Sequence, residues 1–293
     1  MATMLASRPS TIGRVLDQSL QLFRVSVRGV LPFTVIGAVG SLIVGLLFPA
    51  DTQSFGVLVR APAHVPRIGV FGWITTVVTI VIACLAGCAM VHRMAALSAG
   101  SGSTRESILV ALKRAPILLV GSLLLIAVII AGVGALVIAG FILGLLLGSG
   151  VVPFVIAAGA LVLLPLLAVR LSYFYPELIL RDAGPAGALE SSWRMTRGQF
   201  WRLTMLFGIA AGISIALYAG LGFGAKALAA AVVRQGAAPV SAANVAVAVT
   251  SALTQLFGGP FWTSVLLASR HDLLMRAEGW DLIAKIAALP PRA

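Results

Sequence analysis

Long apolar segments without a charge alternate with short charged segments along the whole chain. These apolar segments reach the length of about 20 residues that an α-helix needs to cross a hydrocarbon core of about 30 Å. The pattern therefore predicts an all-α fold, a polytopic transmembrane helical bundle of six spans. The predicted spans are Val30–Pro49, Ile68–Val91, Ile117–Leu147, Val151–Val169, Leu203–Gly224 and Ala242–Ala268.

The boundary in the middle of the chain needs a separate argument. Residues 115–169 form a run of 55 residues without a charge. A single helix of that length would extend about 80 Å at a rise of about 1.5 Å per residue, far beyond the hydrocarbon core. Two helices joined at Gly148–Gly150, just before Pro153, fit this run best, and three short helices are the alternative.

The charges between the predicted spans indicate the orientation. With six spans, the N-terminus, residues 92–116, residues 170–202 and the C-terminus lie on one side and carry 17 of the 21 Lys and Arg residues. The loops on the other side, residues 50–67, 148–150 and 225–241, carry the remaining 4. Because cytoplasmic loops retain Lys and Arg, both termini are expected in the cytoplasm.

Composition excludes several classes of protein. A chain that is 60% hydrophobic and 10% charged is not a soluble globular enzyme, and its 31 Gly and 14 Pro lack the period of collagen. The net charge of +12 indicates cationic loops facing an anionic leaflet rather than a nucleic-acid partner. The first apolar run is a full span rather than a cleavable signal. Arginine far exceeds lysine and Ala and Gly are abundant, which suggests a bacterium with a GC-rich genome.

An amphipathic, basic segment precedes each odd-numbered span. These segments are residues 12–28, with Ser10 or Thr11 as the expected N-cap, residues 105–114, with Thr104 as the expected cap, and residues 188–202. A helix of this kind lies at the headgroup level, with its apolar face buried and its arginines near lipid phosphates. The alternative is that any cationic helix before a span looks like this.

The amphipathic segments and the span ends together suggest a threefold internal repeat. Leu16–Ser19 corresponds to Leu189–Ser192, and the matching stretch of the middle copy begins at Ile108. An arginine, here called an exit arginine, also follows each even-numbered span: Arg93, Arg170 and Arg270. We therefore expect one membrane domain of residues 1–293 built from three units, roughly 10–100, 101–184 and 185–287. The predicted lipid-headgroup contacts are Arg93, Arg170, Arg270, Arg194, Arg197 and Arg202.

Four stretches near the predicted interfaces carry a resemblance to a known family. They are Arg8–Asp17, Leu20–Arg24, Leu189–Arg202 and His271–Leu282. Together they resemble the six-span membrane domain that precedes the catalytic domain of some bacterial glycerophosphodiester phosphodiesterases, a domain that also occurs alone. These motifs are interfacial rather than catalytic, and the phosphodiesterase half with its acidic metal-binding cluster is missing here. The resemblance therefore implies location and architecture rather than an activity.

The sequence offers little catalytic chemistry. It contains no P-loop, HExxH or GxSxG motif, and no acidic residue falls inside a predicted span. Cys84, Cys88 and His92 are spaced four apart and could ligate Cu(I) or Zn, but no fourth ligand is evident. Small residues on one face of a span are more typical of helix packing. We therefore expect no metal and no cofactor.

Two further features concern the spans themselves. Gly140, Gly144 and Gly148 form two overlapping GxxxG steps, which allow close packing against another helix of the chain or of a dimer, the former being favoured. Gly258, Gly259 and Pro260 interrupt the sixth span. A simple kink is the favoured interpretation, and the alternative is a transport cavity near Pro165, Gln255 and Pro260.

These observations predict a non-enzymatic protein of the bacterial inner membrane. It would bind anionic phospholipid at its cytoplasmic face and organise or assist a membrane protein partner. The first alternative is a transporter or lipid-handling protein with a cavity at mid-membrane. The second is an enzyme at the headgroup plane, which would need His92 or His271 beside a carboxylate such as Asp272 or Glu177.

Overall fold

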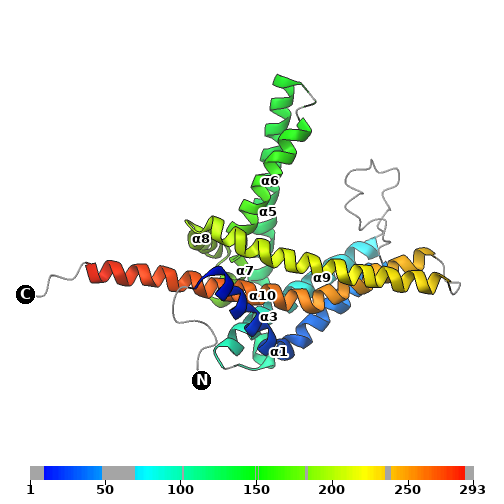
Figure 1. Cartoon of the computed structure of the whole chain (residues 1–293), viewed down its shortest axis with the longest axis horizontal. Helices are drawn as coiled ribbons and strands as arrows, with labels where there is room; N and C mark the ends of the chain where they lie inside the picture. The colour runs from blue at the N-terminus through cyan, green and yellow to red at the C-terminus, as the bar shows by residue number, and fades with distance from the viewer. Residues whose placement is uncertain are drawn as a thin grey trace, which may run out of the picture. The chain divides into compact units, whose positions relative to one another are not determined.

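The computed structural model describes residues 10–47, 70–100, 102–148, 150, 152–181, 184–234 and 239–287. The regular elements in this part of the chain are α-helices (Figure 1). They are α1 (Ile12–Leu47), α3 (Val70–Ser98), α4 (Thr104–Lys113), α5 (Ala115–Leu147), α6 (Val152–Leu171), α7 (Phe174–Leu180), α8 (Pro185–Thr196), α9 (Phe200–Arg234) and α10 (Pro239–Ala287). The predicted loop of residues 50–67 and Ser149 of the predicted turn lie outside the described residues.

Five segments of the described chain are long and apolar enough to cross a membrane. They are Ile12–Gly40, Val81–Ser98, Ala115–Leu146, Val152–Leu180 and Phe200–Ala225. The predicted sixth span, Ala242–Ala268, lies within the 49-residue helix α10. It is not one of the five segments found in the described part of the chain. The all-α, multi-pass fold is thus confirmed, and the count of six stays a prediction.

The chain divides into two compact units. The first contains Asp17–Leu112 and Ile209–Val265, and the second contains Leu5–Leu16, Lys113–Gly208 and Leu266–Ala293. The start of α1 therefore belongs to the second unit and the rest of α1 to the first. All the contacts that build the candidate site below lie within the second unit.

Helices α5 and α6 form an antiparallel hairpin, which Figure 1 shows as two green helices side by side. Because α5 ends at Leu147 and α6 begins at Val152, the two-helix division is confirmed and the three-helix alternative is wrong. A Cβ at Gly140 would lie 3.0 Å from Ile156 Cγ1, and one at Gly144 would collide with the Val152 side chain. These two glycines therefore let α5 and α6 approach closely.

Gly148 has a different place in the hairpin from Gly140 and Gly144. Its φ of 101° ends α5, and its N–H donates to the Gly144 carbonyl at 2.9 Å. A residue with a side chain is strained in this left-handed region of the backbone, so glycine is suited to the turn. No other side chain comes within 4 Å of the position that a Cβ of Gly148 would occupy.

The three amphipathic segments differ from one another in ways that the sequence pattern did not predict. Residues 12–28 are not a separate interfacial helix, because α1 continues from them through Pro32 to Leu47. Residues 188–202 are not one helix either. Helix α8 ends at Thr196, Gly198 takes a φ of 80°, and α9 begins at Phe200. Only the middle segment is a short separate helix followed directly by a span.

The start of α4 also corrects the expected cap. Thr104 is the first helical residue, and Ser103 is the cap. The Ser103 Oγ accepts from the Glu106 N–H at 3.1 Å, while Glu106 Oε2 accepts from the Ser103 N–H at 3.4 Å. This reciprocal pair is a capping box. Pro116 lies in the first turn of α5, where its missing N–H is tolerated.

The core of the second unit lies where α6, α9 and α10 meet. Its buried residues are Val169, Tyr173, Leu203 and Leu273. The partly buried side chains packed against them are Met195, Phe200, Phe207 and Leu266. The Tyr173 hydroxyl donates to Ser269 Oγ at 2.9 Å, so this core contains a polar link as well as apolar contacts. Helix α7, which the sequence analysis did not predict, follows directly on Tyr173 and is almost entirely buried.

Candidate functional site

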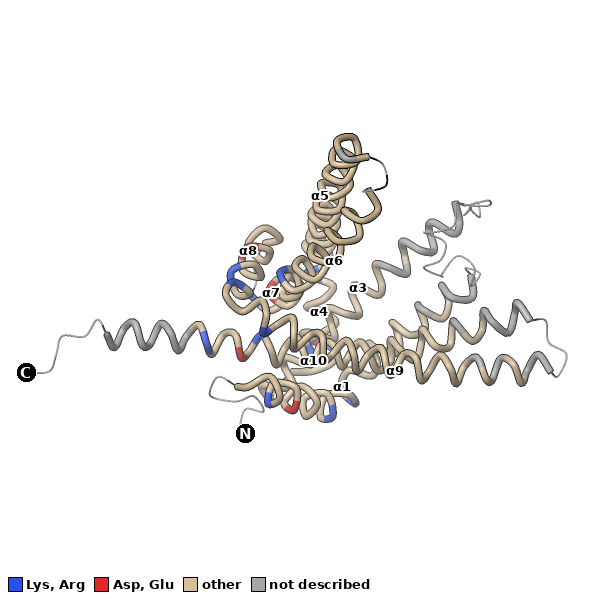
Figure 2. Tube along the Cα trace, turned by 45° about the horizontal axis from the view of Figure 1, so that its top comes forward, with Lys and Arg blue, Asp and Glu red and all other residues tan. Residues whose placement is uncertain are grey.

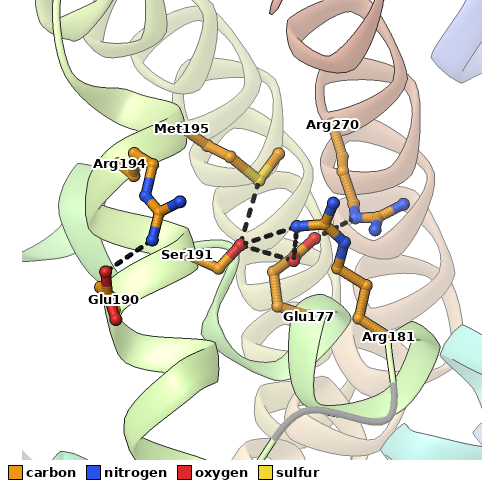
Figure 3. A network of polar contacts seen from close by, with 7 residues as sticks. All are labelled: Glu177, Arg181, Glu190, Ser191, Arg194, Met195 and Arg270. Carbon is orange, nitrogen blue, oxygen red and sulfur yellow. Dashed lines mark hydrogen bonds and ion pairs between the residues drawn. The ribbon is translucent and has the colours of Figure 1, made fainter.

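A buried carboxylate, Glu177 of α7, organises one side of the second unit (Figure 3). Its Oε1 accepts from Arg270 Nε of α10 at 2.7 Å. Its Oε2 accepts from Ser191 Oγ of α8 at 2.7 Å and pairs with Arg181 Nη1 at 3.4 Å. One side chain thus links α7 to the neighbouring helix α8 and to α10, which lies far away in the sequence.

The burial of Glu177 makes these partners essential to the fold. Its side chain has no exposed surface, and that of Arg270 is 14% exposed. Removing ions from water costs several kcal/mol each, and this cost is offset only when the charges are paired and their remaining hydrogen-bonding groups are satisfied. Glu177 meets that condition, because both of its oxygens have partners. Loss of the Glu177 charge would leave the mostly buried Arg270 without its carboxylate, and loss of Arg270 would leave Glu177 with only Arg181 and Ser191.

A second buried carboxylate, Asp272 of α10, holds the segment that precedes α1. Its Oδ1 accepts from the Ser10 backbone N–H at 2.7 Å, and its Oδ2 accepts from Arg202 Nη1 at 2.5 Å and Arg276 Nε at 2.9 Å. The two arginines also donate to the Ser10 carbonyl, at 2.6 and 2.8 Å. Both backbone polar groups of Ser10 are therefore satisfied by side chains of α9 and α10.

The environment of Asp272 favours its charged form. Burial, the largest single influence, raises the pKa of this carboxyl. The hydrogen bonds from the Ser10 N–H, Arg202 and Arg276 and the positive charge of Arg202 act in the opposite direction. Together they outweigh burial, so the pKa of Asp272 lies below its ordinary value of 3.8.

The two clusters share one arrangement. Each carboxylate pairs with an arginine four residues further along its own chain segment, Arg181 for Glu177 and Arg276 for Asp272. Each also pairs with a more deeply buried arginine from another helix and takes one hydrogen bond from a serine. The spacing of four is visible in the sequence as a helical ion pair. The second arginine and the serine lie too far away in the sequence to be recognised there.

The predicted lipid-contact arginines have different surroundings in the structure. Arg202 and Arg270 are bound to Asp272 and Glu177. Arg194 pairs with Glu190 at 2.5 Å, and both side chains are exposed (Figure 3). Arg197 is exposed. The proposed assignment of all six arginines to lipid stays a prediction.

The exit arginines Arg93 and Arg170 are each bound to backbone carbonyl oxygen rather than to a carboxylate. Arg93 Nη1 donates to the Gly102 carbonyl at 2.6 Å within the first unit. Arg170 Nη1 lies 3.3 Å from both the Trp193 carbonyl and Thr196 Oγ1. The Nε atom of each arginine is buried and has no hydrogen-bond partner in the described part of the chain.

The remaining predicted site residues lie as follows. His92 Nδ1 is 3.2 Å from Ser107 Oγ. The described residues contain no group of three or more His, Cys, Asp and Glu side chains placed to hold a metal, and Cys84, Cys88 and His92 form no such group. Pro165 belongs to α6 of the second unit, whereas Gln255 and Pro260 belong to α10 of the first unit. The shared cavity stays a prediction.

The apolar helices define the class of the protein, which is a polytopic, multi-pass helical membrane protein. Residues 133–259 match the family model described as the membrane domain of glycerophosphoryl diester phosphodiesterase, which confirms the predicted resemblance over that range. The range covers less than half of the 293 residues and includes Leu189–Arg202 but not the other three stretches that carry the resemblance. No curated protein and no solved structure matches the chain.

Proposed function

We propose that this chain is a non-enzymatic protein of the bacterial inner membrane that binds anionic phospholipid at its cytoplasmic face and organises or assists a membrane partner. The observation that carries the proposal is the imbalance of charge beside the apolar hairpin. Figure 2 shows α5 and α6 free of charge along most of their length, with basic residues gathered near α7 and α8. Basic residues exceed the carboxylates available there, and anionic headgroups are the natural counter-charge.

Exposed tryptophans beside these arginines support the same proposal. Trp193 of α8 is 46% exposed and Trp201 of α9 is 73% exposed. Tryptophan is enriched at membrane–water interfaces, where its apolar ring and its polar N–H are both accommodated. An amphipathic helix with exposed Trp and Arg is typical of a segment that lies at headgroup depth. Helix α8 therefore supplies the proposed lipid-contact surface.

The proposal retains six spans with both termini in the cytoplasm and a threefold repeat. One observation supports the repeat: Ser19, Ser107 and Ser192 are all fully buried, and each lies on one of the three amphipathic segments at nearly equal intervals of sequence. Aligning the three serines would start the middle copy at Thr104 rather than at Ile108. Ser107 and Ser192 each contact the end of the preceding even-numbered span, at His92 and at the Arg170 carbonyl.

The surroundings of the two carboxylates support a non-enzymatic role. A general acid or base must exchange protons near the working pH and must reach the substrate. Glu177 and Asp272 are instead buried, and each is bound by two arginines. Their partners satisfy the carboxylate oxygens that catalysis would require to be free. This arrangement favours a structural role over the alternative of an enzyme at the headgroup plane.

Lipid analysis of the purified chain tests the proposal. The full chain would be extracted with its surrounding membrane into polymer-bounded discs, and the phospholipids in the discs would be compared with those of the bulk membrane. We expect enrichment of anionic phospholipid relative to discs that hold a single-span control protein. A lipid composition equal to that of the control would contradict the proposal.

A further inference from the structure

Arg170 lies at the end of α6, where α8 fixes its position. Its guanidinium carbon lies 4.9 Å from the centre of the Trp193 ring, which is a cation–π contact. Its Nη1 lies at the long distance of 3.3 Å from the Trp193 carbonyl and from Thr196 Oγ1. Its own carbonyl accepts from Ser192 Oγ at 2.7 Å. Among the described residues, the guanidinium is thus held in place by the tryptophan ring and by long hydrogen bonds alone.

The charge of Arg170 is not neutralised within the described part of the second unit. Arg181 and Arg270 share Glu177, and Arg202 and Arg276 share Asp272. Arg194 is paired with Glu190. In contrast, Arg170 pairs with no carboxylate among the described residues, and its Nε is buried without a hydrogen-bond partner. A guanidinium that is partly desolvated and unpaired is suited to bind an anion from outside the chain.

The surroundings of Arg170 indicate what kind of anion fits. Apolar α6 precedes it directly, and the side chain of Leu164, about two turns earlier, is exposed. On the other side are the half-exposed Trp193 and the exposed Arg197. An anion at this position would have acyl chains on one side and water on the other. A phosphate that carries acyl chains meets both conditions, whereas a soluble phosphate would gain nothing from the apolar surface.

We infer that Arg170, stacked on Trp193 and next to Thr196, binds one phosphate of an anionic phospholipid. Arg170 is the main ligand because its planar fork can donate two parallel N–H groups to phosphate oxygens. Arg202 and Arg270 are assigned to the buried carboxylates and not to lipid. The inference rests on the proposed function, which it narrows from a basic surface to a single site.

The test compares two variants that remove the same charge. The full chain with Arg170→Gln and the full chain with Arg194→Gln would be purified in mild detergent with phosphatidylglycerol, and retained lipid would be counted by native mass spectrometry. Arg194 is a matched control, because this inference assigns its charge to Glu190 rather than to lipid and because it lies on the adjacent helix with an exposed ion pair. We expect Arg170→Gln to lower the affinity for the most tightly retained phosphatidylglycerol about tenfold, the effect of losing hydrogen bonds to a charged group. Arg194→Gln should retain it.

Further variants and a second ligand make the result decisive. Arg170→Lys keeps the charge but loses the planar fork, so it should also bind the lipid more weakly. If Arg170→Gln does not fold, Arg170→Lys and Trp193→Ala carry the test. Equal retention by the wild type and these variants would overturn the inference. Displacement of the bound lipid by millimolar inorganic phosphate would show a soluble-phosphate site and would overturn it as well.

The failure of this inference differs from the failure of the proposed function. If the wild-type chain prefers phosphatidylglycerol to phosphatidylcholine and the Arg170 variants show the same preference, only the assignment of the single site is wrong. If the wild type shows no preference between the two lipids, the proposed function itself is wrong. Spectra recorded with phosphatidylglycerol and, in parallel, with phosphatidylcholine supply both comparisons.

Discussion

The α5–α6 hairpin and the two carboxylate clusters belong to the same unit but are stabilised in opposite ways. The hairpin has no charged side chain between Ala115 and Val169, and its helices meet through glycines and the side chains opposite them. The clusters at Glu177 and Asp272 instead join helices through buried ions and hydrogen bonds. In lipid, apolar side chains gain little by leaving the bilayer, so close packing must hold the hairpin.

This difference indicates which substitutions should destabilise each region. An apolar surface that faces lipid tolerates exchange of one apolar residue for another, as long as the glycine contacts remain. A buried ion pair tolerates almost no change of charge, because the partner that remains is left unpaired. We therefore expect the largest effects of single substitutions in the clusters and smaller effects in the hairpin.

The largest effect should come from Glu177→Gln. This change removes the charge that pairs with Arg270 and Arg181 and leaves the mostly buried Arg270 without compensation. We expect a loss of about 3–5 kcal/mol in the free energy of unfolding, as for other broken buried pairs. Thermal unfolding of the purified chain in detergent would measure it. Glu190→Gln is the control, because its pair with Arg194 is exposed, and an equal effect of both would contradict the comparison.

Asp272→Asn should have the next largest effect. The neutral amide weakens the bonds from Arg202 and Arg276 and the hold on the Ser10 backbone. Hydrogen bonds to charged groups contribute about 1.5–3 kcal/mol each, so we expect a loss of about 2–3 kcal/mol in the free energy of unfolding. Release of the Ser10 backbone would appear as faster cleavage before α1 in limited proteolysis. Unchanged cleavage there would mean that this cluster does not hold the segment.

The pKa of Asp272 also predicts the dependence of this contact on pH. Because the pKa is lowered in the folded chain, the stabilisation is complete above the unfolded value of about 3.9 and is lost as the pH falls through the folded value. The wild type should therefore lose stability below about pH 4 by more than Asp272→Asn does. Parallel acid titrations of both proteins would measure the difference. Superimposable curves would exclude a role for this carboxylate.

In the hairpin, Gly144→Ala should have a smaller effect. Its new Cβ would collide with the Val152 side chain, and the helices would have to separate or Val152 would have to change rotamer. Overpacking of this kind costs about 1–3 kcal/mol. Gly134→Ala is the matched control, since no other side chain lies within 4 Å of its Cβ position. Thermal unfolding of the two variants would separate them, and equal stability would show that close approach at Gly144 is not required.

The smallest effect should come from Ser191→Ala. This change removes one of the three partners of Glu177 and leaves both arginines in place. We expect a loss of about 1–2 kcal/mol, less than for Glu177→Gln. Measuring both variants and the double variant would show how far the serine and the arginines act together.

The sequence predicted the apolar architecture better than the charged site. Hydropathy was enough for the all-α class and for the division of residues 115–169 at Gly148, because helix length and bilayer thickness limit the solutions. The capping box at Ser103 could have been found from its Ser-x-x-Glu pattern, although Thr104 was chosen as the cap. Helix α7 was not predicted because it has only seven residues and contains Pro176, so this stretch appears in the sequence as a loop.

There is a physical reason why the burial of Glu177 could not be predicted from the sequence. A charged residue outside a predicted span indicates only that it lies outside the hydrocarbon core, not whether other helices cover it. Its partners Ser191 and Arg270 are 14 and 93 residues away in the sequence. Contacts of this kind depend on how helices pack together, which local periodicity does not determine.

The Ser10 contact sets an order of events during biosynthesis. A chain made from its N-terminus exposes Ser10 to its surroundings long before Asp272 exists, since 262 residues separate the two. Neither of the arginines that bind the Ser10 carbonyl is available early, because they follow it by 192 and 266 residues. The hairpin of α5 and α6 can insert and close while translation continues, whereas the leading segment must wait for the last helix. In nascent chains arrested before residue 272, the Ser10 backbone should therefore lack the contacts that it makes once Asp272 is present.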